Sequence, residues 1–169
     1  MKTLRARLAS WLFCRLVWGV VSRRPANFTV GADDTAGAYL LRWWLIPRNP
    51  LFNVYLHRFL RSDDDRALHD HPWAWCSLLL KGRYIEHTIA AGGVHRRRVR
   101  LPGSLRIALP STAHRVEILP GEGAWTIFLT GPRVRLWGFH CPDQGWIDFR
   151  RFTAARHGKP GEVGPGCDA

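Results

Sequence analysis

The chain contains little lysine, and its acidic residues are too few to balance its basic ones. Lysine occurs only at positions 2, 81 and 159, although Lys and Arg together number 25 against 13 Asp and Glu. The formal net charge of +12 permits attraction to phosphate, nucleic acid or anionic lipid. Because the arginines are dispersed along the chain, nucleic-acid binding is the less favoured interpretation. A GC-rich genome gives the same arginine bias.

Cysteine is also scarce, and its spacing is not that of a disulfide framework. The four residues are Cys14, Cys76, Cys141 and Cys167, with no CxxC pair among them. Such spacing predicts neither a zinc knot nor a set of disulfides. We therefore expect a reduced, cytoplasmic protein.

A long uninterrupted apolar run is missing as well. Residues 4–21 are strongly apolar, but Arg15 interrupts them and leaves too few for a membrane span. No small-residue cleavage site follows, since residues 22–25 are basic, and this disfavours a signal peptide. A helix over residues 1–24 can pack on the rest of the protein or lie at a membrane surface. Packing is favoured, because the few polar positions do not gather into one polar face.

The size and apolar content of the chain predict one folded domain. Its 169 residues suit a single domain, and a hydrophobic fraction of 46% suffices for a core. Nine tryptophans suggest a lined cavity or well-filled barrel ends, because each ring is bulky and carries one N–H donor. We expect an N-terminal helix (1–24), a β-barrel domain (25–152) and an irregular tail (153–169), the last being rich in Gly and Pro.

Short apolar runs alternate with turn residues through most of the chain after a loop-like segment, residues 26–38. The Ala91-Gly92-Gly93 segment between two runs predicts a hairpin, because glycine accepts the positive φ of tight turns. Strands at this spacing predict an all-β antiparallel sandwich or barrel. The expected strands are residues 39–46, 53–60, 75–80, 84–90, 94–101, 104–109, 114–118, 125–129 and 134–139.

Three histidines have the spacing of a metal site inside such a barrel. Alternate residues of a strand share a face, so His69 and His71 can both turn inward, about 6.5 to 7 Å apart. His114 can join them only if the barrel closes and brings a distant strand alongside. The alternative is an exposed loop pair after the Asp-rich turn. Asp70, between them, is expected to point the other way, pairing with a surface arginine or orienting a ligand.

These residues resemble the motifs of the cupin superfamily. The matching pattern is His69-x-His71 with Gly82, then Gly103, Pro110 and His114, over roughly residues 50–140. The resemblance implies a double-stranded β-helix, or jelly-roll barrel, with one divalent metal, and cupins often form homodimers. The acidic ligand of the family is missing, because Trp75 and Cys76 stand where Glu is expected. A three-His site with open positions remains, for which Fe(II) is expected and Zn or Ni is an alternative.

A closer similarity is to the thiol dioxygenase branch, which also uses three histidines and has cysteine where Glu is lost. His114-Arg115-Val116-Glu117 matches its second motif. Phe128 and Thr130 stand where that branch has His and Tyr, so cysteine is not the expected substrate. The chain is also similar to uncharacterised bacterial and phage-encoded cupins that share its RWW, SDDDRALHDHPW and GFHCP blocks. The implied reaction is non-haem iron dioxygenation of a small anionic molecule.

Five further residues are expected near the site. His57 is a candidate acid–base group or anion holder, because its pKa lies near neutrality, and the alternative is an ordinary wall residue. Cys76, Tyr55, Trp125 and His140 are expected to line the cavity or to support the ligands, with Cys76 also a possible fourth ligand.

Two other functions stay open at this point. One is a metal-dependent isomerase or lyase that uses His57 as base. The other is a non-catalytic module that binds sugar phosphate, nucleic acid or a protein through Arg96, Arg98 and Arg100, which share one face of a strand. For that arginine row, a charged edge that resists aggregation is the favoured interpretation.

Overall fold

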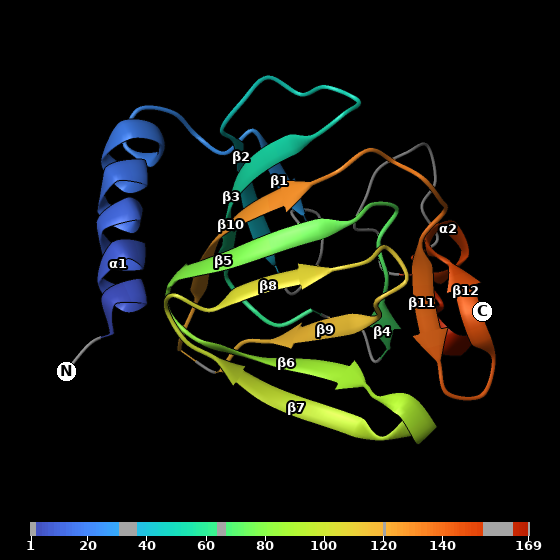
Figure 1. Ribbon diagram of the computed structural model, residues 1–169. Coiled ribbons are helices and arrows are strands. Elements are labelled where there is room, and N and C mark those ends of the chain that lie inside the picture. Colours follow the sequence, from blue (N-terminus) through green and yellow to red (C-terminus); the bar gives the residue numbers. More distant parts are fainter. Residues whose placement is uncertain (1–2, 31–36, 64–66, 120, 154–163, 169) are drawn as a thin grey trace.

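The computed structural model describes residues 3–30, 37–63, 67–119, 121–153 and 164–168, and these form two antiparallel sheets with a helix beside them (Figure 1). The first sheet has the order β1 (Phe28–Val30), β2 (Leu40–Trp44), β3 (Asn53–Phe59), β10 (Ala124–Thr130), β5 (Trp75–Lys81), β8 (Leu105–Ala108). The second has the order β12 (Gly145–Asp148), β11 (Gly138–Cys141), β4 (Leu68–His69), β9 (His114–Glu117), β6 (Tyr84–Ile89), β7 (His95–Arg100). Strands distant in sequence thus become neighbours, and the all-β prediction is confirmed.

Strand β10 illustrates why these segments form a two-faced sheet. Thr126, Phe128 and Thr130 are buried on the inner face, while Trp125 and the other residues of opposite parity point outward. This is the period of two expected for a strand. The outward residues are also apolar, and this indicates that another element covers part of that face.

That element is the N-terminal helix α1 (Leu4–Leu16), which continues as a π-helical turn over Val17–Val21. The Thr3 side chain caps it by accepting a hydrogen bond from the Ala6 N–H at 3.3 Å. One face of α1 packs with Trp43 and Trp125 of the first sheet through Ala9, Leu12, Phe13 and Leu16. The helix is therefore present as expected, and it packs on the barrel. No helix among the described residues is long and apolar enough to cross a membrane.

Most of the predicted strands match the structure closely. The exceptions are in the N-terminal and C-terminal parts of the chain. The hairpin at Ala91–Gly93 joins β6 to β7 as predicted. The strand predicted over residues 134–139 is wrong for its first part, because strand β11 begins only at Gly138. Val134 instead lies in a connection, where its N–H donates to the Pro72 carbonyl at 2.8 Å. Strands β1 and β12 and the short helix α2 (Phe149–Phe152) were not predicted, and β4 is shorter than the strand expected at His69 and His71.

A disulfide joins Cys141 to Cys167, so the prediction of unpaired cysteines was wrong for this pair. The two residues are 26 positions apart, a spacing that fits no common motif, and only the folded chain brings them together. The argument for a reducing compartment loses its support from cysteine pairing. Of the predicted irregular tail, residues 154–163 and 169 lie outside the described residues, whereas Gly166–Asp168 form a short 3-10 helix.

Candidate metal centre

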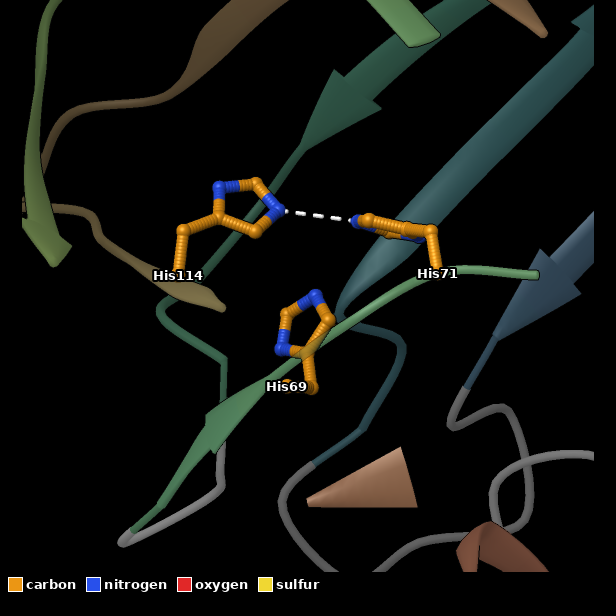
Figure 2. A group of neighbouring side chains, drawn as sticks. All are labelled: His69, His71 and His114. Carbon is orange, nitrogen blue, oxygen red and sulfur yellow. Dashed lines mark hydrogen bonds between the residues drawn. The ribbon is translucent and has the colours of Figure 1, made fainter. Parts of the chain in front are cut away.

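The three predicted histidines converge in the interior between the two sheets (Figure 2). His69 ends β4 and pairs directly with His114 at the start of β9. His71 lies just beyond the strand, and its N–H donates to the Pro110 carbonyl at 3.0 Å. The strand is thus shorter than expected, but both side chains still turn inward.

The ring nitrogens are close enough to share one ion. One ligand atom from each of His69, His71 and His114 lies within 4.8 Å of the others. The Nε2 atoms of His71 and His114 are 2.9 Å apart, and Figure 2 shows the three rings turned toward one another. Nitrogen atoms at roughly 2.0 to 2.1 Å from a common centre lie at most about 4.2 Å apart, so the three rings would draw slightly closer together around an ion.

The electrostatics of the site favour neutral imidazoles. Burial lowers the pKa of His71 well below its usual value, and the adjacent rings of His114 and His69 lower it further. Burial also lowers the pKa of His114. A neutral imidazole keeps a lone pair for a metal ion, so the donor set fits a divalent transition metal.

Two carboxylates lie behind the ligand histidines. Glu86 Oε1 is 3.6 Å from His114 Nδ1, and Asp63 Oδ2 is 3.8 Å from His69 Nδ1. Both separations exceed a hydrogen bond, yet each carboxylate favours a hydrogen on the facing Nδ1. That tautomer leaves Nε2 of each ring as the free lone pair.

Glu86 is held in place by two arginines from neighbouring strands. Arg100 donates to Glu86 Oε2, and Arg106 Nε donates to Oε1 at 3.1 Å. Burial raises the pKa of Glu86, but the nearby His114 and Arg100 more than offset this and lower it to about 2. The carboxylate is therefore ionised in the fold, and its position is fixed.

Asp70 fixes the backbone between the first two ligands. Its side chain is 1% exposed and accepts hydrogen bonds from Arg135 Nη1 at 2.6 Å and from the Gly138 N–H at 2.8 Å. Trp146 Nε1 at 3.1 Å and His140 Nε2 at 3.3 Å approach the same carboxylate. Asp70 therefore points away from the ligands as expected, into a buried network rather than the surface.

Aromatic rings form the wall beside the histidines. Trp75 stacks on His114 with ring centroids 4.7 Å apart and on Phe128 at 5.5 Å. Within the described part of the chain, Trp73 Nε1, Trp75 Nε1 and Thr130 Oγ1 are buried without a hydrogen-bond partner. Unpaired buried polar groups are costly, so these three groups are available to hydrogen-bond a polar ligand.

A partly buried arginine lies next to this wall. Arg42 Nε donates to His57 Nε2 at 2.8 Å, and its guanidinium lies 4.9 Å over the Tyr55 ring. Burial lowers the pKa of Arg42, and none of the carboxylates that the structure describes pairs with it. Its charge also contributes to lowering the pKa of His71. Arg42 therefore offers an uncompensated positive charge close to the three histidines.

His57 itself is buried at the same place. It stacks on Phe128 at 5.1 Å and on Tyr55 at 5.8 Å, so both of these rings lie on the inner face with it. Burial, reinforced by Arg42, lowers the pKa of His57 well below its usual value. Since Nε2 already accepts from Arg42, the geometry favours a supporting role for His57, and its predicted acid–base role stays a prediction.

Two of the predicted cavity residues were placed on the wrong face. Cys76 pairs with Leu129 and Ile107, which lie on the outer face, so neither the cavity position nor the fourth-ligand role holds for it. Trp125 packs on α1, with its ring 5.4 Å from Phe13. The physical reason is strand parity, since Trp75 in β5 and the even-numbered residues of β10 are the ones that point inward.

His140 and the arginine row lie outside the group of ligand histidines. His140 does not lie among the ligand histidines but reaches Asp70, so it supports the site indirectly. Of the predicted row, Arg100 is paired with Glu86, while Arg96 and Arg98 are exposed on the edge strand β7. The row is therefore not one continuous free surface.

Arg42, Glu86 and Asp63 were not predicted from the sequence. Arg42 and Glu86 each interrupt an apolar run of a predicted strand at an inward position, and this was the available signal. Asp63 belongs to the Asp-rich turn and carried no such signal. Its Oδ2 accepts from the Val116 N–H at 2.8 Å, a contact between segments far apart in sequence.

The known proteins that resemble this chain give information on its fold and not on its activity. No protein-family model matches the chain. No curated protein matches it either. The polyketide cyclase RemF from Streptomyces resistomycificus is similar in structure, with a TM-score of 0.55 and 14% identity, over 80% of this chain and 89% of that one.

Two further solved structures are more distant. A cupin-like protein from Thermotoga maritima has a TM-score of 0.49 and 15% identity over 80% of this chain and 97% of its own. A cupin superfamily protein from Desulfitobacterium hafniense has a TM-score of 0.45 and 11% identity, over 55% of this chain and 77% of its own. The two antiparallel sheets and their strand order confirm the expected jelly roll, and the likeness to RemF supports the fold alone.

Proposed function

We propose that this protein is a mononuclear metal enzyme, a non-haem iron dioxygenase-like cupin that acts on a small anionic molecule. The observation that carries the proposal is the convergence of His69, His71 and His114, whose ligand atoms lie within 4.8 Å of one another. Three neutral imidazoles leave the charge of a divalent ion uncompensated, so an anionic substrate is favoured.

The residues around the histidines support binding of such an anion. Arg42 supplies a positive charge in a partly buried setting, where its attraction is less screened than at the surface. The unpaired N–H groups of Trp73 and Trp75 are donors for the same molecule. His57 holds Arg42 in place by accepting its Nε–H. The aromatic wall excludes water from the bound molecule.

The metal ion would be held by His69, His71 and His114. When bound, Fe(II) would supply Lewis-acid and redox chemistry at its open positions. Glu86 and Asp63 would keep Nδ1 of two ligands protonated and so leave Nε2 free.

Metal analysis tests the site itself. The protein purified without added metal is expected to contain close to one equivalent of a transition metal, and His114→Ala is expected to lose most of it. His95→Ala is the matched control, because His95 is exposed on β7 outside the group. Equal metal content in His114→Ala and the unaltered protein would contradict the assignment.

Oxygen uptake tests the reaction. After anaerobic loading with Fe(II), we expect uptake with at least one of a panel of thiols, diketones and organic acids. Arg42→Lys is expected to raise KM for an anionic substrate, because lysine cannot reproduce the Nε contact with His57. Turnover without oxygen and with zinc would assign an isomerase or lyase instead. No uptake with any member of the panel would leave the dioxygenase proposal contradicted.

A further inference from the structure

Helix α1 has a second apolar face that the barrel does not cover. Leu4, Leu8, Trp11 and Trp18 are 82%, 56%, 59% and 72% exposed. Their spacing of three, four and seven residues places them on one stripe of a helix. The packed residues of α1 lie on the opposite side of the same helix. The helix is thus apolar on two faces, and this explains why no broad polar face was found in the sequence.

The charged residues of the N-terminal segment that carries this stripe are all basic. No acidic residue precedes Asp33 in the sequence, whereas Arg5, Arg7, Arg15, Arg23 and Arg24 surround the helix. The groups that face α1 from the first sheet are also basic. The Lys81 ammonium lies 4.9 Å over the Phe13 ring, and the Arg58 guanidinium lies 5.2 Å over Trp125.

This combination matches one kind of partner. Exposed Trp and Leu side chains next to arginines suit the interface of a bilayer, where the rings enter the headgroup region and the cations meet lipid phosphates. Arg15 interrupts the stripe near its centre. A helix that lies flat on the bilayer tolerates this, because the long arginine side chain can reach the lipid headgroups. A second copy of the chain is disfavoured, because two basic surfaces of a protein with net charge +12 would face each other.

We propose that the exposed stripe formed by Leu4, Leu8 and Trp11 of α1 and by Trp18 of the π-helical turn that follows it docks the protein on an anionic lipid bilayer. The helix lies in the membrane surface while its opposite face stays packed on the barrel. The docking is independent of the metal site, since the stripe shares no residue with it.

Co-sedimentation of the full-length protein with vesicles tests the proposal. Vesicles of phosphatidylcholine with about 30% phosphatidylglycerol, a fraction of anionic lipid on the order of that in natural membranes, are compared with vesicles of pure phosphatidylcholine. We expect at least about tenfold stronger binding to the anionic vesicles, weakened by high salt. The double variant Trp11→Ala with Trp18→Ala is expected to lose most of the binding to anionic vesicles. The double variant Arg7→Gln with Arg15→Gln is expected to do the same.

Matched controls come from the β6–β7 hairpin, which lies away from α1 in Figure 1. Ile89→Ala with Val94→Ala removes apolar side chains that are 52% and 56% exposed, and Arg96→Gln with Arg98→Gln removes two charges. Both controls are expected to keep binding. Equal losses in the controls, or no preference for anionic vesicles, would overturn the proposal. A dimer in solution that Trp11→Ala with Trp18→Ala converts to a monomer would assign the stripe to self-association instead.

Discussion

Single side chains behind the histidines decide how the site is arranged. Glu86 and Asp63 each face the Nδ1 atom of a ligand ring, and Glu86 is in turn bound by Arg100 and Arg106. A buried carboxylate paired in this way orients its histidine, because turning the ring would lose the favourable contact with its Nδ1. The position of the site thus depends on side chains that would not touch the ion.

Replacing Glu86 with Gln is expected to weaken both the metal site and the fold. Metal affinity should fall about 10- to 100-fold, because the neutral amide no longer favours the required tautomer of His114. Stability should fall by about 3 kcal/mol, because Arg100 and Arg106 are left without a counter-charge. Metal titration and urea unfolding measure the two effects. Glu122→Gln, in the exposed pair with Arg83, is the control and should change little. Unchanged metal affinity in Glu86→Gln would contradict the orienting role.

At the scale of elements, the pairing of β11 with β12 stabilises the segment that carries His69 and His71. The Gly138 N–H donates to Asp70, and a Cβ at Gly138 would lie 2.1 Å from the Ile147 carbonyl oxygen of the neighbouring strand. Only glycine lets β12 approach so closely. The strand pairing and the buried network of Asp70 therefore depend on the same position.

Gly138→Ala is expected to lower the free energy of unfolding by at least about 2 kcal/mol, because backbone must move to admit the methyl group. Metal affinity should fall with it, since the Asp70 contact shifts. Gly19→Ala is the control, because nothing lies within 4 Å of a Cβ there and alanine favours helix by up to about 1 kcal/mol. Thermal unfolding of both variants decides the matter. Equal stability of Gly138→Ala and the unaltered protein would show that the two strands can separate freely.

At the scale of the whole molecule, the disulfide joins β11 to the last described segment of the chain. Closing the loop between Cys141 and Cys167 is expected to stabilise the fold by about 3 kcal/mol. Cys141→Ser with Cys167→Ser should therefore lower Tm by about 6 to 12 °C. Cys14→Ser with Cys76→Ser is the control. Calorimetry compares the two double variants, of which only the control keeps the disulfide. An equal Tm for both would contradict a stabilising role of the disulfide.

Stability should also depend on pH through the buried His57. Its folded pKa is lowered by burial, so its contribution is complete above the unfolded value and is lost as pH falls below about 6.5. Unfolding of the metal-free protein should become easier by about 1 kcal/mol between pH 6.5 and 5.5 from this group. His57→Gln should remove that part of the slope, whereas the exposed His95→Gln should keep it. An unaltered slope in His57→Gln would contradict a neutral, buried histidine.

The sequence by itself determined the strands, the N-terminal helix and the convergence of three histidines. Period-two alternation and turn residues are local properties, so they are readable from neighbours in the chain. The motif spacing around His69, His71 and His114 is likewise readable in the sequence, and it led to the prediction of a jelly roll that the two sheets confirm.

Tertiary structure alone decided which face of each strand became the interior and which distant residues met. Strand parity placed Trp75 rather than Cys76 beside His114, because a shift of one residue exchanges the two faces of a strand. The contact of Glu86 with His114 and the bond between Cys141 and Cys167 join segments whose approach depends on the closed pair of sheets. Such contacts leave no local pattern, because their partners are fixed by packing rather than by neighbours in the chain.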